Sequence, residues 1–210
     1  MRKVLVTGIT GFAGGHLAAL LSKDDGLEIH GTYHSLGSDK KLSELTNIYL
    51  HQVDLSVKDQ VNSLIDAIVP DQVYHLAAQS SPSESFKNPE GTLNTNTLSQ
   101  LYLLEALLRQ DNHPRIVTVT SSEIYGKVDF SELPVNELTP HRPISPYAVS
   151  KITQDYLSLY FYLAYDLNVI RVRPFNHTGP GQEKFVIPAF ARQIAQIEKS
   201  GEEPILKVGN

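Results

Sequence analysis

The 210-residue chain has no cysteine, no tryptophan and a single methionine. The absence of cysteine excludes disulfide bonds and thiolate-based metal or redox chemistry. The chain also lacks a basic run, and its formal net charge of -5 argues against nucleic-acid binding as its main role. No stretch approaches the roughly 18 consecutive apolar residues of a membrane span, and the segment after Met1 is too short for a signal-peptide core. We therefore expect a cytoplasmic protein that binds neither nucleic acid nor membrane.

The remaining composition is that of a globular protein. Hydrophobic residues make up 41% of the chain and charged residues 20%, which is enough apolar material to bury a core. The eight histidines are scattered along the chain without a cysteine partner. We expect them to be structural or loop histidines, and we expect no metal site.

A glycine-rich turn lies between a short β-branched run and an apolar helical pattern near the start of the chain. Gly8, Gly11 and Gly14 are spaced G-x-x-G-x-x-G. A strand that runs into such a turn and a helix N-terminus forms an anion site, because backbone N–H groups and the positive end of the helix dipole face one point. We expect Gly8 to allow the tight turn, Gly11 the close approach of a pyrophosphate, and Gly14 the packing of helix on strand. A dinucleotide cofactor is predicted; the alternative is a flexible N-terminal loop.

Strand and helix patterns then alternate along the chain. Strands are expected at 27–33, 47–53, 72–78, 115–120 and 168–173. Helices are expected at 57–69, 92–110, 146–165 and 188–199, with a polar loop at 79–90 and strand character at 205–208. This order predicts an α/β, Rossmann-like, doubly wound parallel sheet with helices on both faces. Its site should lie along the carboxyl ends of the strands.

The end of the second expected strand bears on the choice of cofactor. An acidic residue there favours NAD, but this chain has neither a carboxylate nor an arginine at that point. His34 and Ser35 are placed to bond a 2′-phosphate, so NADP(H) is slightly preferred and NAD(H) stays open; both are otherwise plain loop residues. Asp54, at the tip of the third strand, either accepts from an adenine amino group or caps the next helix.

The residues that indicate chemistry are Tyr147 and Lys151, spaced i, i+4 at the start of an expected helix. This spacing places both on one helix face. An ammonium near a phenol is expected to lower the phenol pKa toward working pH, so that the tyrosine can shuttle a proton. Ser121, at the tip of the fifth expected strand, is a candidate to hold a substrate oxygen beside Tyr147. The spacing alone is common on amphipathic helices, and the preceding glycine turn gives it meaning.

Taken together, these segments make the chain resemble the extended short-chain dehydrogenases/reductases that modify nucleotide sugars, over all 210 residues. The matching segments, in order, are Thr7–Gly14, His75–Ser80, Asn96 with Leu101–Ala106, Ser121–Gly126 and Pro146–Lys151. The resemblance implies an NAD(P)-binding domain over 1–176 and, over 177–210, the start of a substrate-binding part that is largely absent. It also implies a homodimer formed through the two long helices.

The resemblance assigns roles to individual residues. Ser121 takes the catalytic Ser/Thr position, Tyr147 is the proton donor or acceptor, and Lys151 binds the nicotinamide ribose and tunes the tyrosine. Further cofactor contacts are expected from Phe12, Ala13, Leu55, Leu76, Ala77, Ala78 and Asn96. Substrate contacts are expected from Gln79, Ser80, Ser122, Asn176 and Arg192. Asn176 is alternatively a turn residue, and Arg192 part of a solvated helix face.

Within the family, the segment Arg173–Gln182 resembles reductases of GDP-4-keto-6-deoxy-D-mannose. A GDP-linked 4-keto-6-deoxy sugar is therefore the expected partner, with a GDP-D-rhamnose type product. The segment Ser121–Val128 also resembles the GDP-mannose 4,6-dehydratases, in which the glutamate at the position of Glu123 removes the C5 proton. Glu123 is alternatively a bridging carboxylate that moves no proton. A nucleotide-sugar 4-epimerase and a non-catalytic, dinucleotide-binding redox sensor remain as alternatives.

Overall fold

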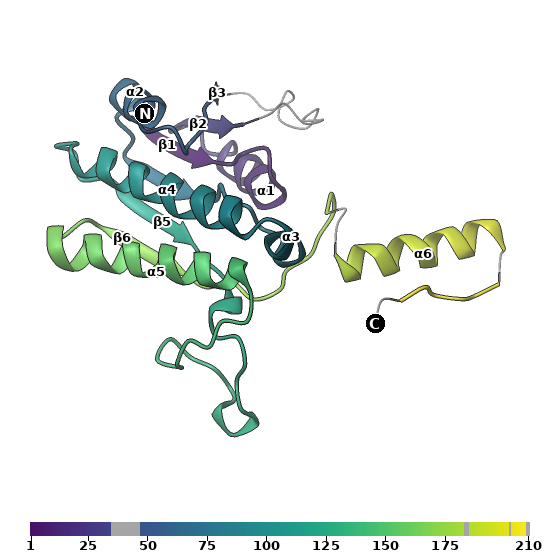
Figure 1. The fold of residues 1–210 in the computed structure, drawn as a ribbon. Helices are drawn as coiled ribbons and strands as arrows, with labels where there is room; N and C mark the ends of the chain where they lie inside the picture. The colour runs from purple at the N-terminus through teal and green to yellow at the C-terminus, as the bar shows by residue number, and fades with distance from the viewer. Residues whose placement is uncertain (35–46, 183–184, 202, 209–210) are drawn as a thin grey trace. The chain divides into compact units, whose positions relative to one another are not determined.

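Six parallel strands form one sheet in the computed structural model, which describes residues 1–34, 47–182, 185–201 and 203–208. The strands are β1 (Arg2–Thr7), β2 (Leu27–Tyr33), β3 (Ile48–Gln52), β4 (Gln72–His75), β5 (Arg115–Val119) and β6 (Val169–Val172). Their order in the sheet is β3-β2-β1-β4-β5-β6 (Figure 1). The strand order reverses between β1 and β4, so the crevice at their carboxyl ends is where ligands bind in such sheets.

Helices cover the sheet on both faces, which confirms the predicted Rossmann-like class. They are α1 (Phe12–Leu21), α2 (Lys58–Ile68), α3 (Pro82–Lys87), α4 (Pro89–Leu108), α5 (Pro146–Tyr165) and α6 (Val186–Ser200), with 3₁₀ turns η1 (Ser122–Ile124) and η2 (Phe130–Glu132). Side chains of β1 alternate between the faces. Val4 and Val6 pack in one core cluster with Ala18 of α1, whereas Leu5 packs in another with Ile65 of α2 and Leu104 of α4.

The contacts divide the chain into two units, Met1–Phe175 and Asn176–Asn210. The first contains the whole sheet and helices α1 to α5. The second contains α6, followed by a segment in which the sequence predicted strand character at 205–208. That prediction is wrong, because the described residues there form no strand. Instead, the backbone of Lys207 bonds the side chain of Gln193, with its N–H 2.8 Å from Oε1.

The polar segment 79–90 differs from the loop that was predicted. It contains α3, whose first turn is capped by Ser81: the hydroxyl accepts from the N–H of Glu84 at 3.3 Å. The next helix, α4, begins at Pro89 rather than at the predicted residue 92, because Asn88 caps it by accepting from the N–H of Gly91 at 2.9 Å. In both cases a capping side chain and a proline at the first helical position start the helix.

Strand β4 also ends earlier than expected, at His75 instead of residue 78. The next two backbone N–H groups, those of Leu76 and Ala77, donate to Oγ1 of Thr7, both at 3.1 Å. A side chain of β1 thus replaces the sheet partner at this point. Among the described residues, none of the helices is both long and apolar enough to cross a lipid bilayer.

Candidate active site

The turn between β1 and α1 forms the glycine-rich wall of the site. Gly8 has a φ of 68°, and a Cβ there would lie 2.9 Å from Cα of Ala77. A Cβ on Gly14 would lie 2.3 Å from the carbonyl oxygen of Gly8, so α1 packs directly on the turn. Gly11 is the N-cap residue of α1. The helix begins within the turn, and this arrangement fits a pyrophosphate.

Thr7 links the ends of β1 and β4 beside this turn. Its Oγ1 accepts from the N–H groups of Leu76 and Ala77 and lies 2.9 Å from Nδ1 of His75. The two N–H donors fill the acceptor positions of the hydroxyl. Its own hydrogen therefore points to Nδ1, and His75 carries its proton on Nε2. Burial lowers the pKa of His75 to about 3, which keeps the ring neutral.

Three of the predicted catalytic residues come together at the tip of β5. Tyr147 lies in the first turn of α5, which Ser145 caps by accepting from the N–H of Ala148 at 3.0 Å. The side chains of Tyr147 and Ser121 share a hydrogen bond, and the carboxylate of Glu123 is close enough to act on Tyr147 electrostatically. Tyr147 and Ser121 are 7% and 8% exposed, so both hydroxyl groups are largely withdrawn from water.

Lys151 lies one helical turn after Tyr147 and is only 4% exposed. Its Nζ donates to the backbone oxygen of Val119 at 3.1 Å and to Oε1 of Gln154 at 2.8 Å. The same atom lies 5.8 Å from the ring centroid of Tyr147. Burial lowers the pKa of Lys151 to about 7, so its ammonium and amine forms are both populated near neutral pH.

The expected effect of Lys151 on Tyr147 is wrong: the pKa of Tyr147 is raised rather than lowered. Burial is the main cause, the hydrogen bond with Ser121 opposes it, and the charge of Glu123 raises the pKa further. The i, i+4 spacing predicted proximity, but it carries no information about burial, which disfavours the charged form of both groups. The phenol is therefore protonated at neutral pH.

A run of buried hydrogen bonds joins α4 to α5 behind Lys151. We call it the amide ladder; it consists of Asn96 and Gln100 of α4 with Ser150, Gln154 and Ser158 of α5, all of them buried. Asn96 Nδ2 donates to Ser150 Oγ at 2.9 Å, and Gln154 Nε2 donates to the backbone oxygen of Asn96 at 2.9 Å. Gln100 Nε2 donates to the backbone oxygen of Gln154 at 2.6 Å and to Ser158 Oγ at 2.9 Å.

No role was predicted from the sequence for Gln100, Gln154 or Ser158. A signal was present, because polar residues recur every fourth position on each helix, at 96 and 100 and at 150, 154 and 158. Such spacing places them on one face of each helix. Only the pairing of the two helices turns these faces into one network.

Asn96 also holds the segment that follows β4. Its Oδ1 accepts from the N–H of Gln79 at 2.7 Å, and its Nδ2 donates to the carbonyl of Gln79 at 3.1 Å. The Gln79 side chain bonds the backbone of Ser81, while Ser80 is exposed. Asn96 thus positions the neighbouring backbone from a fully buried site. Its cofactor contact, and the substrate contacts of Gln79 and Ser80, stay predictions.

A second buried cluster fixes the chain just beyond Glu123. The carboxylate of Asp155 is fully buried and accepts from Nη1 of Arg171 at 2.6 Å and from Nε of Arg173 at 2.8 Å. Nη1 of Arg173 reaches further, to the hydroxyl of Tyr125 at 3.1 Å and the backbone oxygen of Glu137 at 3.0 Å. These arginines pull the pKa of Asp155 below its usual value against the effect of burial.

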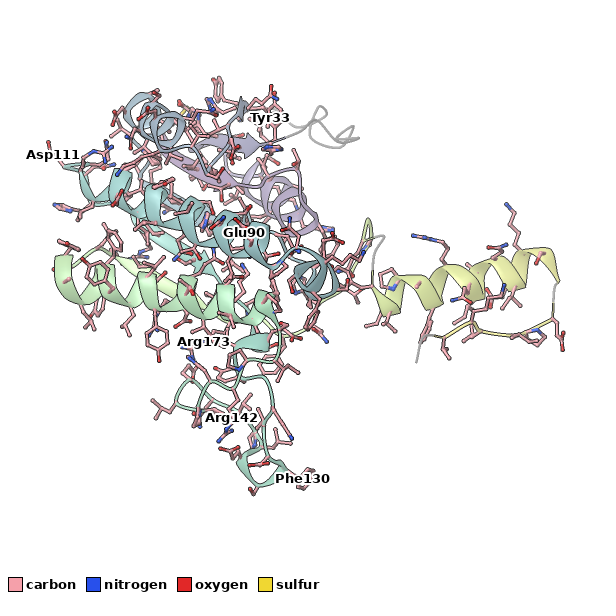
Figure 2. All side chains as sticks on the ribbon, in the orientation of Figure 1. Tyr33, Glu90, Asp111, Phe130, Arg142 and Arg173 are labelled. Carbon is pink, nitrogen blue, oxygen red and sulfur yellow. The ribbon has the colours of Figure 1, made fainter. Side chains whose placement is uncertain are left out.

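Arg173 thereby anchors the root of the long loop between η1 and α5. Figure 2 shows Arg173 near the sheet, Arg142 further along this loop and Phe130 at its tip. Arg142 pairs with Glu132 through two hydrogen bonds, at 2.6 and 2.8 Å. Phe130 is 91% exposed, so the loop is held by polar pairs rather than by a core of its own.

The predicted adenosine end of the site is described in part. Nε2 of His34 lies 3.9 Å from Oδ2 of Asp54. Oδ1 of Asp54 accepts from both the hydroxyl and the N–H of Ser56, at 2.6 and 2.9 Å, and these bonds lower the Asp54 pKa. The N-cap residue of α2 is Val57, so the alternative in which Asp54 caps that helix is wrong. Ser35 lies outside the described residues.

The other predicted contacts occupy several places. Phe12 and Ala13 form the first turn of α1, beside the glycine turn. Leu55 is buried in the core cluster that contains Leu5. Ser122 opens η1 and donates its N–H to the backbone oxygen of Pro174 at 2.9 Å.

The last two predicted residues, Asn176 and Arg192, belong to the second unit. Asn176 is its first residue, and Arg192 lies on α6. Their roles stay predictions, like those of Leu76, Ala77 and Ala78, which follow β4.

The chain is similar in sequence to known enzymes named for GDP-linked sugars, and in fold to a solved structure. GDP-6-deoxy-D-mannose reductase of Pseudomonas aeruginosa is 36% identical over 211 aligned residues, which cover 100% of this chain and 64% of that protein. GDP-mannose 4,6-dehydratase of Yersinia enterocolitica is 34% identical, over 100% of this chain and 59% of that protein. The solved structure of RMD from Pseudomonas aeruginosa, complexed with NADPH, superposes with a TM-score of 0.79 at 33% identity, covering 96% of this chain and 64% of that one.

The chain therefore spans about three fifths of the length of the curated relatives that it matches. The family described as GDP-mannose 4,6 dehydratase matches residues 5–210, which include the glycine turn, the amide ladder and the site around Tyr147. By this match and by its six-stranded Rossmann-like sheet, the chain belongs to the GDP-mannose 4,6-dehydratase family.

Proposed function

We propose that the chain forms the cofactor-binding and catalytic part of an enzyme that reduces the C4 keto group of a GDP-4-keto-6-deoxy hexose to a GDP-D-rhamnose type product. The observation that carries the proposal is the placement of Ser121, Tyr147 and Lys151 together at the carboxyl end of β5. The 36% identity to the Pseudomonas aeruginosa reductase over the full chain supports the choice of substrate.

The protonation state of Tyr147 suits a reduction. Carbonyl reduction needs a proton donor at the oxygen, and the raised pKa of Tyr147 keeps its phenol protonated. Ser121, which shares a hydrogen bond with Tyr147, holds the substrate oxygen in reach of that proton. The nicotinamide, when bound, supplies the hydride that C4 accepts. Lys151, with a pKa of about 7, is able to gain or lose a proton at Nζ beside the phenol under working conditions.

The residues present fit a nicotinamide dinucleotide. Gly8, Gly11 and Gly14 bring a helix N-terminus and close backbone to one point, where a pyrophosphate binds. His34 supports NADPH as the preferred form, because a 2′-phosphate accepts hydrogen bonds from such a side chain. Asp54 lies 3.9 Å from His34 and adds a negative charge, so NADH stays in the test.

The proposal is tested by the loss of reduced-nicotinamide absorbance when the chain is mixed with GDP-4-keto-6-deoxy-D-mannose, with NADPH and NADH measured separately. Tyr147→Phe should lower kcat by roughly 100-fold or more, as expected for loss of a general acid. The matched control is Tyr162→Phe on the same helix, whose side chain is about half exposed. Equal rates in Tyr147→Phe and the wild type would contradict the proposal. Cofactor binding without oxidation would contradict the reductase and leave dehydratase chemistry on GDP-mannose or a redox sensor as the candidates.

One observation favours a second function. Glu123 follows Ser121 closely and acts electrostatically on Tyr147, so a carboxylate base lies near the phenol. The GDP-mannose 4,6-dehydratases are 34% identical to the chain in the example from Yersinia enterocolitica. A dehydratase would convert GDP-mannose to a 4-keto-6-deoxy product and lose that activity in Glu123→Gln. The reductase should retain most of its NADPH oxidation in the same variant.

A further inference from the structure

Gln154 is a fully buried amide that connects Lys151 to the neighbouring helix. Its Oε1 accepts from Nζ of Lys151 at 2.8 Å, and its Nε2 donates to the backbone oxygen of Asn96 on α4 at 2.9 Å. The two bonds are consistent with one orientation only, because a reversed amide would point its N–H groups at Nζ. The amide oxygen of Gln154 thus faces a donor, the Nζ of Lys151, and its amide nitrogen faces an acceptor, the backbone oxygen of Asn96.

The donors of Lys151 explain what this contact does. Nζ carries three hydrogens as an ammonium and two as an amine. Among the residues that the structure describes, its hydrogen-bond partners are two neutral acceptors, the backbone oxygen of Val119 at 3.1 Å and Oε1 of Gln154. These acceptors occupy two positions around Nζ in either protonation state. The third position is the one that gains or loses the proton.

We propose that Gln154 is a positioning residue for Lys151: it anchors Nζ to the backbone of α4 through Asn96 and so fixes the direction in which Nζ presents its exchangeable position. Nζ lies 5.8 Å from the ring centroid of Tyr147, so this direction determines whether the exchangeable position of Nζ faces the phenol. The catalytic value of that arrangement rests on the proposed function, whereas the placement of Nζ does not.

The neutrality of Gln154 is part of the proposal. Among the described residues, the titratable neighbours of Nζ are His75 of β4, which is neutral, and Tyr147 of α5, which keeps its proton. Burial sets the pKa of Lys151, and within the described part of the chain Nζ forms no ion pair. A carboxylate at position 154 would form a buried ion pair with Nζ and hold it as an ammonium. Replacing the amide of Gln154 by a carboxylic acid of the same length therefore shows how a charge at position 154 changes the pKa of Lys151.

The test measures the titration of Lys151 directly, by NMR of the full chain labelled with [ε-¹³C]lysine, without cofactor or substrate. Lys151→Met identifies the resonance. Gln154→Glu should raise the midpoint of Lys151 by about one pH unit or more, because a buried carboxylate stabilises the ammonium. Gln154→Met, similar in length and uncharged, should lower the midpoint, because the ammonium loses an acceptor. It carries the test if the acidic variant does not fold.

The matched control is Gln100→Met, which removes another buried amide of the ladder that bonds Gln154 and Ser158 but not Lys151. It should leave the midpoint of Lys151 within about 0.3 pH units of the wild type. An unchanged midpoint in folded Gln154→Glu or Gln154→Met, or an equal shift in Gln100→Met, would overturn the proposal. Since no substrate is used, a failure of the reductase assay leaves this result intact. In an active enzyme, Gln154→Glu should shift the pH profile of kcat in the same direction as the midpoint.

Discussion

Replacing Lys151 with methionine should stabilise the folded chain near neutral pH, although it removes a proposed catalytic group. The unfolded chain holds a proton on this lysine up to a pKa of 10.5, whereas burial lowers the folded value to about 7. Between these values the unfolded state binds more protons, so stability rises with pH. Below pH 7 the folded protein carries the full cost of withdrawing this charge from water, and at pH 7 it carries most of it.

The size of the effect follows from the two pKa values. One pKa unit is worth about 1.4 kcal/mol, so lowering the Lys151 pKa from 10.5 to about 7 costs roughly 5 kcal/mol. Methionine fills the space of the aliphatic stem but leaves Val119 O and Gln154 Oε1 without Nζ, at a combined cost of roughly 3 kcal/mol. A net gain of roughly 2 kcal/mol remains at pH 7.

The assay is urea unfolding followed by far-ultraviolet circular dichroism, at intervals from pH 6 to 10. The chain has no cysteine, so alkaline conditions bring no thiol oxidation. The advantage of Lys151→Met should shrink by up to about 1.4 kcal/mol per pH unit above pH 7 and then reverse. Lys23→Met, at an exposed position, controls for the loss of one positive charge from the whole chain. A difference that stays constant from pH 7 to 10 would refute the reasoning.

Three further predictions concern the surrounding structure. Gly14→Ala should lower the unfolding free energy by roughly 1–3 kcal/mol in thermal unfolding, because its Cβ would lie 2.3 Å from a backbone oxygen; Gly15→Ala, with 3.9 Å of clearance, should be neutral or stabilising. Asp155→Asn should cost roughly 3–5 kcal/mol in urea at pH 7, because two arginines lose their buried carboxylate, and a loss below 1 kcal/mol would contradict this. The pKa of His75 falls from 6.5 to about 3 on folding, so between these values the unfolded chain binds more protons than the folded chain. Lowering the pH below 6.5 should therefore reduce the unfolding free energy of the wild type more than that of His75→Phe, as measured by urea unfolding. An equal pH dependence in the two proteins would count against this prediction.

Much of the fold was predictable because its signals are local. The β-branched run before Gly8 and the apolar periodicity of residues 57–69 each indicate one element without reference to the rest of the chain. The helix over Pro146–Tyr165 was predicted to the residue. The errors lie where a single side chain sets the boundary of an element. Thr7 ends β4 by accepting from the N–H groups of Leu76 and Ala77. Ser81 starts a helix inside a polar segment by accepting from the N–H of Glu84.

The candidate site shows the same division. The spacing of Tyr147 and Lys151 predicted that the two side chains lie near each other, because residues four positions apart lie on the same face of a helix. The pKa of Tyr147 was predicted in the wrong direction, because burial depends on how α5 packs on the sheet and on α4. The hydrogen bond between Nζ of Lys151 and Oε1 of Gln154 could not be predicted either, because the orientation of the Gln154 amide depends on the backbone oxygen of Asn96 on another helix.

The amide ladder has a consequence for how finely α5 is aligned. Two helices that meet through aliphatic side chains alone can slide by a turn and exchange one set of similar contacts for another. Here Asn96 and Gln100 each bond particular groups of α5, so a displacement of α5 along α4 by a few ångströms breaks every one of these bonds at once. The position of α5 along its neighbour is thus restricted to a single register, and the phenol and amine that it carries inherit that alignment.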